Sequence, residues 1–155
     1  SPPARGRRAV ATHLLPCNLP LNPSTMPRDL IAIDHIHVFV TNRPAAVEWY
    51  RQALGLLPSP DFAFWASDGG PLTLPNPSGS VHIALFERPS QPCRSTIALR
   101  VDAPSFKAWR AHLNDFLPGA VSEEDHTVSR SLYFRDPDGN PYEITTYDVA
   151  ALTRG

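Results

Sequence analysis

The sequence holds few cysteines, little excess charge and no long apolar run. Cys17 and Cys93 are the only cysteines and no CxxC spacing occurs, so we expect no disulfide framework and a reducing, cytoplasmic setting. The 14 basic and 15 acidic residues give a formal net charge of −1, which offers no electrostatic basis for binding nucleic acid or a membrane surface. No apolar stretch approaches the roughly 20 residues that span a bilayer. We therefore expect any ligand to be recognised by a local site and not by the overall charge of the protein.

Several catalytic and binding motifs are also missing. The sequence has no GxSxG, no glycine-rich loop that would cradle a phosphate, and no interleaving of aromatic with basic residues. These absences argue against a serine hydrolase, a nucleotide-binding domain and a nucleic-acid-binding module.

The length of 155 residues fits one domain, preceded by a proline-rich arm. Residues 1–28 show neither helical nor strand periodicity, and an ordered pattern begins just after Met26, the only methionine. We therefore expect the arm to be upstream or added sequence. The domain is expected at 29–148, followed by a C-terminal tail at 149–155.

The first half of the domain, residues 30–88, has the pattern of a strand, a helix and three strands. In IDHIHVFV, which begins at Ile33, aliphatic residues alternate with histidine and phenylalanine, as in a strand with one aliphatic face. Asn42 is a capping residue and Pro44 fits a first helical turn, while Gly55 ends the helical pattern. Further strands are expected at 62–67, 72–74 and 81–86.

The second half, residues 94–148, repeats this order, with Asp102 and Pro104 opening its helix. Ile36 and Ile97 are 61 residues apart, and so are Ile83 and Ile144. We predict an α+β fold in which two βαβββ repeats form a curved, half-barrel mixed sheet with the helices outside.

The same 61-residue offset makes four further positions equivalent in pairs. It relates His35 to Thr96, and His82 to Glu143, on the faces opposite the aliphatic residues. If the two sheets curve together, these faces line one concavity. The residues expected to point into it are His35, His37, Phe39, His82, Phe86, Thr96, Arg100, Tyr133, Glu143 and Thr145.

Such a lining is too polar for a core and predicts a divalent-metal site. Unpaired imidazoles and carboxylates buried there would cost several kcal/mol, so they need each other, water or a metal. Two imidazoles and one carboxylate, supplied by His35, His82 and Glu143, suit an ion that keeps positions open for substrate oxygens. Fe, Mn, Zn and Ni are all candidates. The competing interpretation is that the histidines are ordinary polar strand residues and that Glu143 is solvated.

Other polar residues have more than one role open to them. His37 lies two residues from the first predicted ligand and either replaces it, acts as an acid or base, or makes a hydrogen bond that orients a ligand. Tyr133 either donates its phenol to a substrate oxygen or packs beside the hairpin. Arg100 either pairs with an anionic substrate or with Glu143, and the second pairing would weaken the case for metal. His126 is expected at the mouth of the cavity.

Two long stretches resemble the vicinal oxygen chelate superfamily, which includes glyoxalase I, extradiol dioxygenases, fosfomycin-resistance enzymes, methylmalonyl-CoA epimerase and bleomycin-resistance proteins. They are IDHIHVFVTNRPAAVEWYRQALG and SRSLYFRDPDGNPYEITTY, and the resemblance covers about residues 30–148. It implies that His35 and Glu143 take the two best-kept ligand places and His82 a third. It also implies a homodimer, often with sites shared between chains. Thr96 departs from the family, because that position often holds a second histidine.

The stretch DHTVSRSLYFRDPDGNPYE resembles the last part of extradiol dioxygenases, which implies substrate-side roles for His126 and Tyr133. The leading hypothesis is therefore a metal-dependent enzyme for a small oxygen-rich molecule that chelates the ion. A dioxygenase-like reaction is slightly favoured over a glyoxalase-like isomerisation.

The alternative is a metal-free protein that binds a drug or another hydrophobic ligand. A purely structural dimer is a weaker third interpretation. Aromatic walls for the metal-free site would come from Phe39, Trp65, Phe86 and Tyr133.

Overall fold

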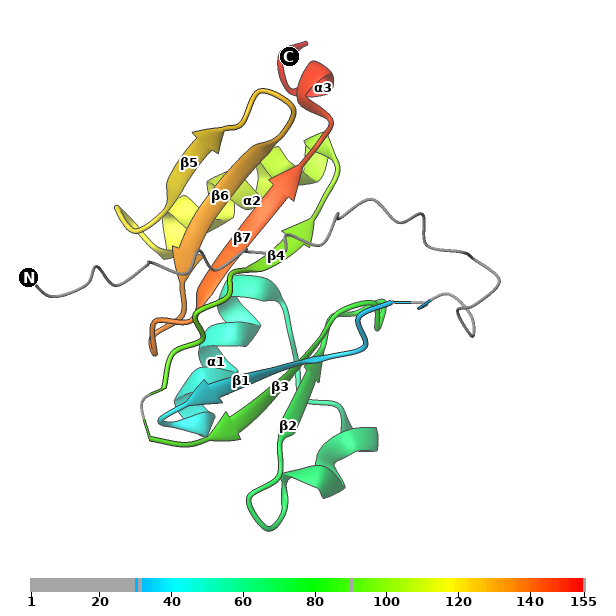
Figure 1. The fold of residues 1–155 in the computed structure, drawn as a ribbon, viewed down its shortest axis with the longest axis vertical. Helices are drawn as coiled ribbons and strands as arrows, with labels where there is room; N and C mark the ends of the chain where they lie inside the picture. The colour runs from blue at the N-terminus through cyan, green and yellow to red at the C-terminus, as the bar shows by residue number, and fades with distance from the viewer. Residues whose placement is uncertain (1–29, 31, 90, 155) are drawn as a thin grey trace, which may run out of the picture. The chain divides into compact units, whose positions relative to one another are not determined.

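The computed structural model describes residues 30, 32–89 and 91–154, so the predicted arm at 1–28 lies outside the described residues. Residues 33–155 form one compact unit. Its elements are β1 (Ile36–Val40), α1 (Arg43–Leu54), the 3-10 helix η2 (Pro60–Ala66), β2 (Leu72–Pro75), β3 (His82–Glu87), β4 (Ile97–Arg100), α2 (Ala103–Phe116), β5 (Ser122–Asp125), β6 (Arg130–Arg135), β7 (Pro141–Thr146) and α3 (Val149–Leu152) (Figure 1).

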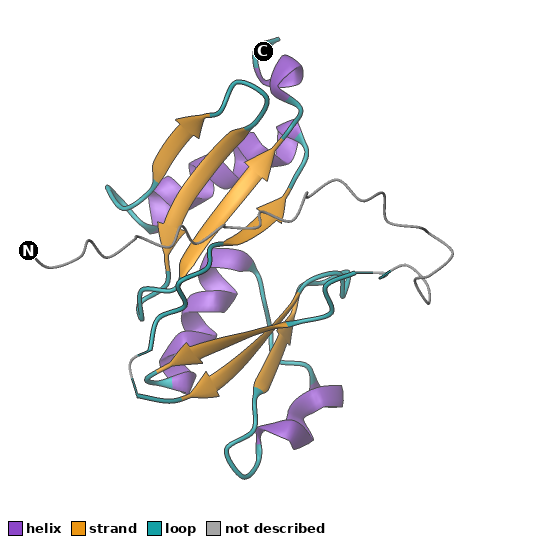
Figure 2. Ribbon diagram, viewed as in Figure 1, coloured by secondary structure: helices purple, strands orange, loops and turns teal. Residues whose placement is uncertain are grey.

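The strands form two sheets, one from each half of the unit (Figure 2). The first has the order β1-β3-β2 and the second the order β4-β7-β6-β5. Strand β1 is parallel to β3 and β4 is parallel to β7, while the remaining pairs are antiparallel. Helix α2 lies against one face of the second sheet (Figure 2). The predicted α+β class, with two related halves and helices outside the sheets, is confirmed.

The strand predicted at 62–67 is wrong, because Pro60–Ala66 forms the 3-10 helix η2. Pro60 fits the first turn of a helix. Side chains three residues apart eclipse in a 3-10 helix, and Phe62 and Trp65 accordingly stack with ring centroids 5.1 Å apart and an interplanar angle of 6°. The run of aromatic residues that suggested a strand thus forms one exposed ridge.

The 61-residue offset is not kept along the whole repeat. His37 and Ala98 are related by it, and His37 pairs with Ala84 whereas Ala98 pairs with Glu143. Ala84, and not His82, therefore takes the place of Glu143 in the first sheet. The predicted equivalence of His82 and Glu143 is wrong by two residues. A shift of two preserves the alternation of faces, so the sequence pattern could not reveal it.

Both predicted helix starts are confirmed by their caps. The Asn42 side chain accepts a hydrogen bond from the backbone N–H of Ala45, and the Asp102 side chain accepts one from Ser105. Gly55 ends α1 in the left-handed region at φ 66°, which glycine adopts without steric cost. No helix among the described residues is long and apolar enough to cross a bilayer.

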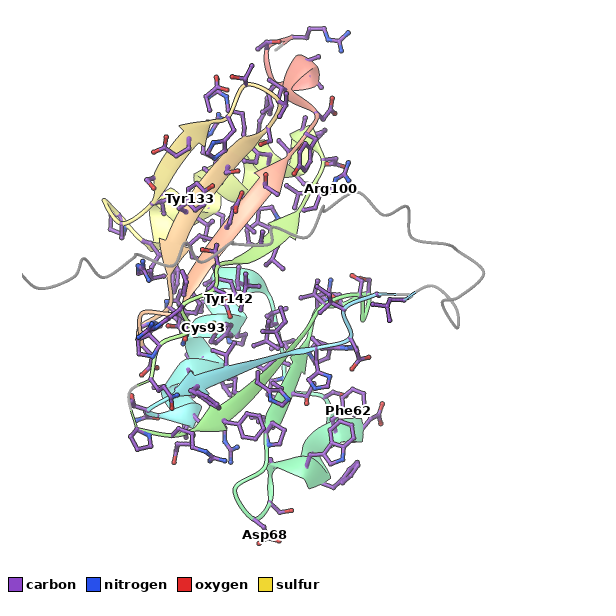
Figure 3. All side chains as sticks on the ribbon, in the orientation of Figure 1. Phe62, Asp68, Cys93, Arg100, Tyr133 and Tyr142 are labelled. Carbon is purple, nitrogen blue, oxygen red and sulfur yellow. The ribbon has the colours of Figure 1, made fainter. Side chains whose placement is uncertain are left out.

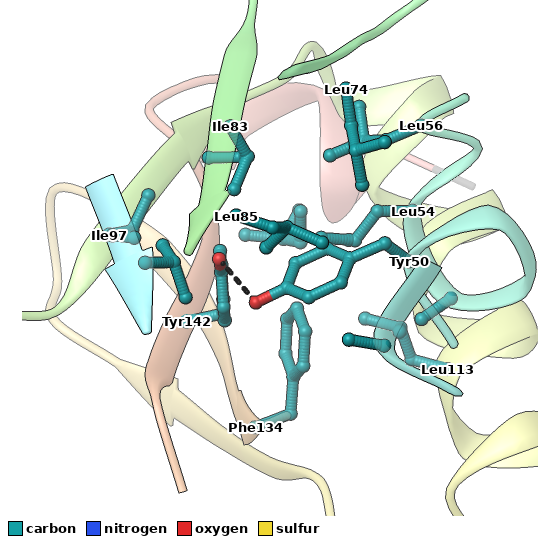
Figure 4. Packing of buried hydrophobic residues seen from close by; sticks show 14 of the residues in the cluster. Tyr50, Leu54, Leu56, Leu74, Ile83, Leu85, Ile97, Leu113, Phe134 and Tyr142 are labelled. Atoms are coloured by element: carbon teal, nitrogen blue, oxygen red, sulfur yellow. Dashed lines mark hydrogen bonds between the residues drawn. The ribbon is translucent and has the colours of Figure 1, made fainter. Parts of the chain in front are cut away.

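A buried polar contact lies inside the apolar core. The Tyr50 hydroxyl of α1 donates to Asp136 Oδ2 at 2.7 Å and lies 2.9 Å from the Tyr142 hydroxyl of β7 (Figure 4). Since Tyr50 gives its only proton to Asp136, Tyr142 is the donor to Tyr50. Burial raises the pKa of both phenols above the ordinary tyrosine value, so both keep the proton that the contact requires.

Replacing Tyr50 by phenylalanine tests how much this contact stabilises the fold. Tyr50→Phe leaves the buried Asp136 carboxylate without one donor, so we expect the free energy of unfolding to fall by about 1–3 kcal/mol. Urea unfolding followed by circular dichroism measures the change. Tyr147→Phe, at an exposed tyrosine, is the matched control and should change stability by less than about 0.5 kcal/mol. Equal unfolding midpoints for the two variants would contradict the assignment.

Candidate functional site

Asp34, just before β1, contacts the first two histidines predicted as ligands. Its Oδ2 lies 2.6 Å from His35 Nδ1, and its backbone carbonyl oxygen lies 3.1 Å from His82 Nδ1. Because both partners are oxygen acceptors, each Nδ1 carries the ring proton and each Nε2 keeps its lone pair. The hydrogen bond with His35 holds the pKa of the Asp34 carboxyl below its ordinary value. Metal-ligating imidazoles are commonly oriented by such contacts.

His37 lies on β1 beside His35, which directly precedes the strand. The two Nε2 atoms are 3.1 Å apart and the rings stack with centroids 5.1 Å apart. On its other side His37 meets the Phe86 ring at 4.8 Å, and Phe86 in turn meets Phe39 at 5.9 Å. The predicted ring-bearing face of the first sheet is thus present, with imidazoles at one end and phenylalanines at the other.

An aromatic wall from η2 stands next to these histidines. Phe62 meets His82 edge to face at 6.0 Å (Figure 3 labels Phe62), and Trp65 stacks on Phe62. A cavity of about 190 Å³ lies between this wall and the sheet. Its lining includes Asp34, His35 and His82, so a small planar molecule held there would touch both imidazoles and aromatic rings.

Two larger hollows border Thr96, which precedes β4. One, of about 520 Å³, also touches His35, His82 and Arg100, and the other, of about 800 Å³, touches His37. Thr96 therefore borders one hollow shared with His35 and His82 and another shared with His37. Its hydroxyl supplies a polar group where the resemblance implies an imidazole.

The second sheet carries the remaining predicted residues on β6 and β7. Glu143 accepts a hydrogen bond from Ser131 Oγ at 2.6 Å and lies opposite Tyr133 in the strand register. The Tyr133 hydroxyl lies 2.9 Å from His126 Nε2 (Figure 3 labels Tyr133). Glu143, Tyr133 and His126 thus form a second polar group.

Arg100 does not use the carboxylate that was one of its two predicted partners. Its guanidinium stacks over the Tyr147 ring, 5.2 Å from the centroid, and no ion pair joins it to Glu143 in the described part of the chain. The planar group keeps its N–H edges available to an anion while it stacks.

The structure gathers the predicted residues in two groups, one on each sheet. His35, His37 and His82 meet through direct contacts or through Asp34, whereas Glu143 belongs to the other sheet. In residues 30, 32–89 and 91–154, no three histidine, cysteine, aspartate or glutamate side chains are arranged to hold an ion. One chain alone therefore does not bring the three predicted ligands to one point.

Two residues of the site carried no sequence prediction. Asp34 precedes β1, so the alternation of the strand says nothing about where its side chain points, although a carboxylate directly before a histidine was a signal. Ser131 is fully buried and shares its strand face with Tyr133, which the alternation of β6 shows. Predicting that Ser131 donates a hydrogen bond to Glu143 would have required the register in which β6 pairs with β7.

The family follows from a sequence match that spans most of the compact unit. Residues 32–144 match the model of the Glyoxalase/Bleomycin resistance protein/Dioxygenase superfamily. The chain belongs to this superfamily. No curated protein matches it. The resemblance to the vicinal oxygen chelate proteins is thus confirmed.

Solved structures agree with this superfamily fold. An integron cassette protein from the mobile metagenome of the Halifax Harbour sewage outfall is 20% identical, with a TM-score of 0.61 over 76% of this chain and 99% of its own. FosX, a fosfomycin resistance protein from Listeria monocytogenes complexed with Mn(II) and sulfate, is 13% identical, with a TM-score of 0.57 over 81% of this chain and 98% of its own. A glyoxalase/dioxygenase from Nostoc punctiforme is 19% identical, with a TM-score of 0.56 over 84% of this chain and 97% of its own. At these identities the likeness concerns the fold.

Proposed function

We propose that the chain is a divalent-metal-dependent enzyme of the glyoxalase/extradiol dioxygenase type, acting on a small oxygen-rich molecule. The observation that carries the proposal is the double contact of Asp34, which occupies Nδ1 of both His35 and His82 and leaves the lone pair of each Nε2 to coordinate an ion. The Mn(II) present in the FosX complex supports a metal in this fold. A dioxygenase-like reaction is slightly favoured over isomerisation.

The donor set fits the ion. Two imidazoles with the Glu143 carboxylate suit Fe(II), Mn(II), Zn(II) or Ni(II) and leave room for substrate oxygens. Such an ion supplies Lewis acidity toward neighbouring oxygens of the substrate. In this proposal the Tyr133 hydroxyl, hydrogen-bonded to His126, holds or returns a proton at a substrate oxygen. Arg100 and Thr96 face the substrate with a cation and a hydroxyl.

The aromatic side chains would select the shape of the substrate. Phe39 and Phe86 adjoin His37 on the first sheet, and Phe62 and Trp65 adjoin His82. A flat ring placed among them gains offset or edge-to-face contacts. A preference for a planar molecule would add to the resemblance of residues 125–143 to extradiol dioxygenases, which is the basis for favouring a ring-cleaving reaction.

We further propose a homodimer whose sites are shared between subunits. His35 directly precedes β1, His82 begins β3 and Glu143 lies on β7 of the other sheet, and within the described residues they do not meet in one chain. A second copy, related by twofold symmetry, would offer its own Glu143 to these histidines and receive the same contact in return.

Metal analysis tests the proposal directly. Protein purified without chelator should carry close to one divalent ion per chain, and Glu143→Ala should lower the affinity at least about tenfold because a charged ligand is lost. Elemental analysis after gel filtration measures the loading, and circular dichroism checks the fold. Absence of a bound ion from the unmodified protein, or equal loading of both proteins, sinks the metal-dependent function.

Oxygen uptake distinguishes the two reaction types. With the ion that the protein carries, a panel of catechols should give ring cleavage with consumption of one O₂ per catechol. Tyr133→Phe should lower the rate by about 10²-fold or more, the contribution typical of a positioned acid or base. No uptake with any catechol, together with turnover of hemithioacetals, would favour isomerisation.

Mixing two inactive variants tests the shared site. In a dimer formed from His35→Ala and Glu143→Ala chains, a shared arrangement restores one intact site of the two. Refolding the two proteins together in equal amounts should therefore recover about one quarter of the wild-type metal loading, since half of the dimers are mixed. Either protein refolded alone is the control. No recovery would mean that the ligands come from one chain.

A metal-free binding protein is the second candidate. It is favoured by the exposed aromatic ridge of η2, in which Trp65 and Phe64 remain about half and two-thirds exposed beside the small cavity. In that case Phe39, Trp65, Phe86 and Tyr133 would form the walls for a hydrophobic ligand. The metal analysis decides between the two functions.

A further inference from the structure

The contact between His35 and His37 has the dimensions of a metal chelate. Their Nε2 atoms are 3.1 Å apart, His37 lies on β1, and His35 directly precedes the strand with its ring stacked on that of His37. With metal–nitrogen bonds near 2.0–2.1 Å, two nitrogens on one ion lie about 2.9 Å apart at an octahedral angle and about 3.3 Å apart at a tetrahedral angle. The observed separation falls between these values.

The neighbouring side chains orient the His35 and His37 rings for binding an ion. Asp34 Oδ2 engages His35 Nδ1, which leaves the His35 Nε2 lone pair directed toward His37. In this structure His37 Nε2–H donates to that lone pair. When His37 carries its proton on Nδ1 instead, both lone pairs point at the same place and need a cation between them. His37 is held opposite Ala84 by the pairing of β1 with β3, and His35 lies two residues before it, at the entry to the strand.

We propose that His35 and His37 chelate the divalent ion together through their Nε2 atoms, with Asp34 as the positioning residue of His35. This inference rests on the proposed function, because it concerns the same ion, and it adds His37 as a further imidazole ligand beside His35. No third protein ligand is placed at the same point by the residues that the structure describes. The other coordination positions are therefore open to His82, to a carboxylate from a second copy and to substrate oxygens.

Calorimetric titration of the full chain with Ni²⁺ and Zn²⁺ tests the chelate, since both ions accept imidazole. His35→Gln and His37→Gln should each lower the affinity by about tenfold or more, and Asp34→Asn should lower it by a smaller factor because only the orientation of a ligand is lost. The control is His112→Gln on α2, where Nε2 contacts the Gln52 carbonyl oxygen instead of another imidazole. It should bind like the unmodified protein.

Cobalt substitution gives a second readout that does not depend on affinity. Each imidazole bound to Co²⁺ through Nε2 contributes one strongly shifted, exchangeable Nδ1–H proton signal, and His37→Gln should remove one signal while melting temperature stays within a few degrees. Wild-type affinity and an unchanged signal count in His37→Gln, with loss in His35→Gln, would overturn the chelate and leave the proposed function intact. No binding by the unmodified protein would overturn both.

Discussion

The buried carboxylate of Asp136 is the interaction on which the arrangement of the two halves depends. Its Oδ1 accepts hydrogen bonds from the backbone N–H groups of Asp138 and Asn140, and its Oδ2 accepts from Tyr50 and the Asn140 side chain. A buried carboxylate without partners would cost several kcal/mol, so these donors are required for the chain to enclose it. They fix the turn between β6 and β7 and tie it to helix α1 of the other half.

The same turn holds the strand that carries the imidazoles. Asn140 is fully buried, donates to the Phe39 carbonyl oxygen at the end of β1 and accepts from the Cys93 N–H ahead of β4. Asp138 accepts from both the backbone and the hydroxyl of Thr41. Strands β1 and β7 are therefore positioned by one turn, even though they belong to different sheets. Besides connecting β6 to β7, this turn therefore holds in place the strands that carry the two polar faces.

Much of the fold could be predicted because its signals are local. Alternation located the strands around Ile36 and Ile144, and the caps at Asn42 and Asp102 located both long helices. The helix η2 was missed, because a run of aromatic residues fits a strand as well as a 3-10 turn. The polar faces were predicted correctly as faces. Their detailed geometry was not, because contacts such as that of Asp34 with two histidines depend on strand pairing and on the path of the chain before β1.

The donor types divide between the sheets, and this division constrains any chemistry at the site. The first sheet presents imidazole nitrogen from His35, His37 and His82, whereas the second presents oxygen from Glu143, Tyr133 and Ser131. Nitrogen donors hold a transition metal firmly, and hydroxyl and carboxylate groups move protons. An ion bound at the imidazoles would need the oxygen-rich face of another sheet to balance its charge. Thr96, directly before β4, lines both hollows that these imidazoles border, so it adds a hydroxyl oxygen and no further nitrogen there.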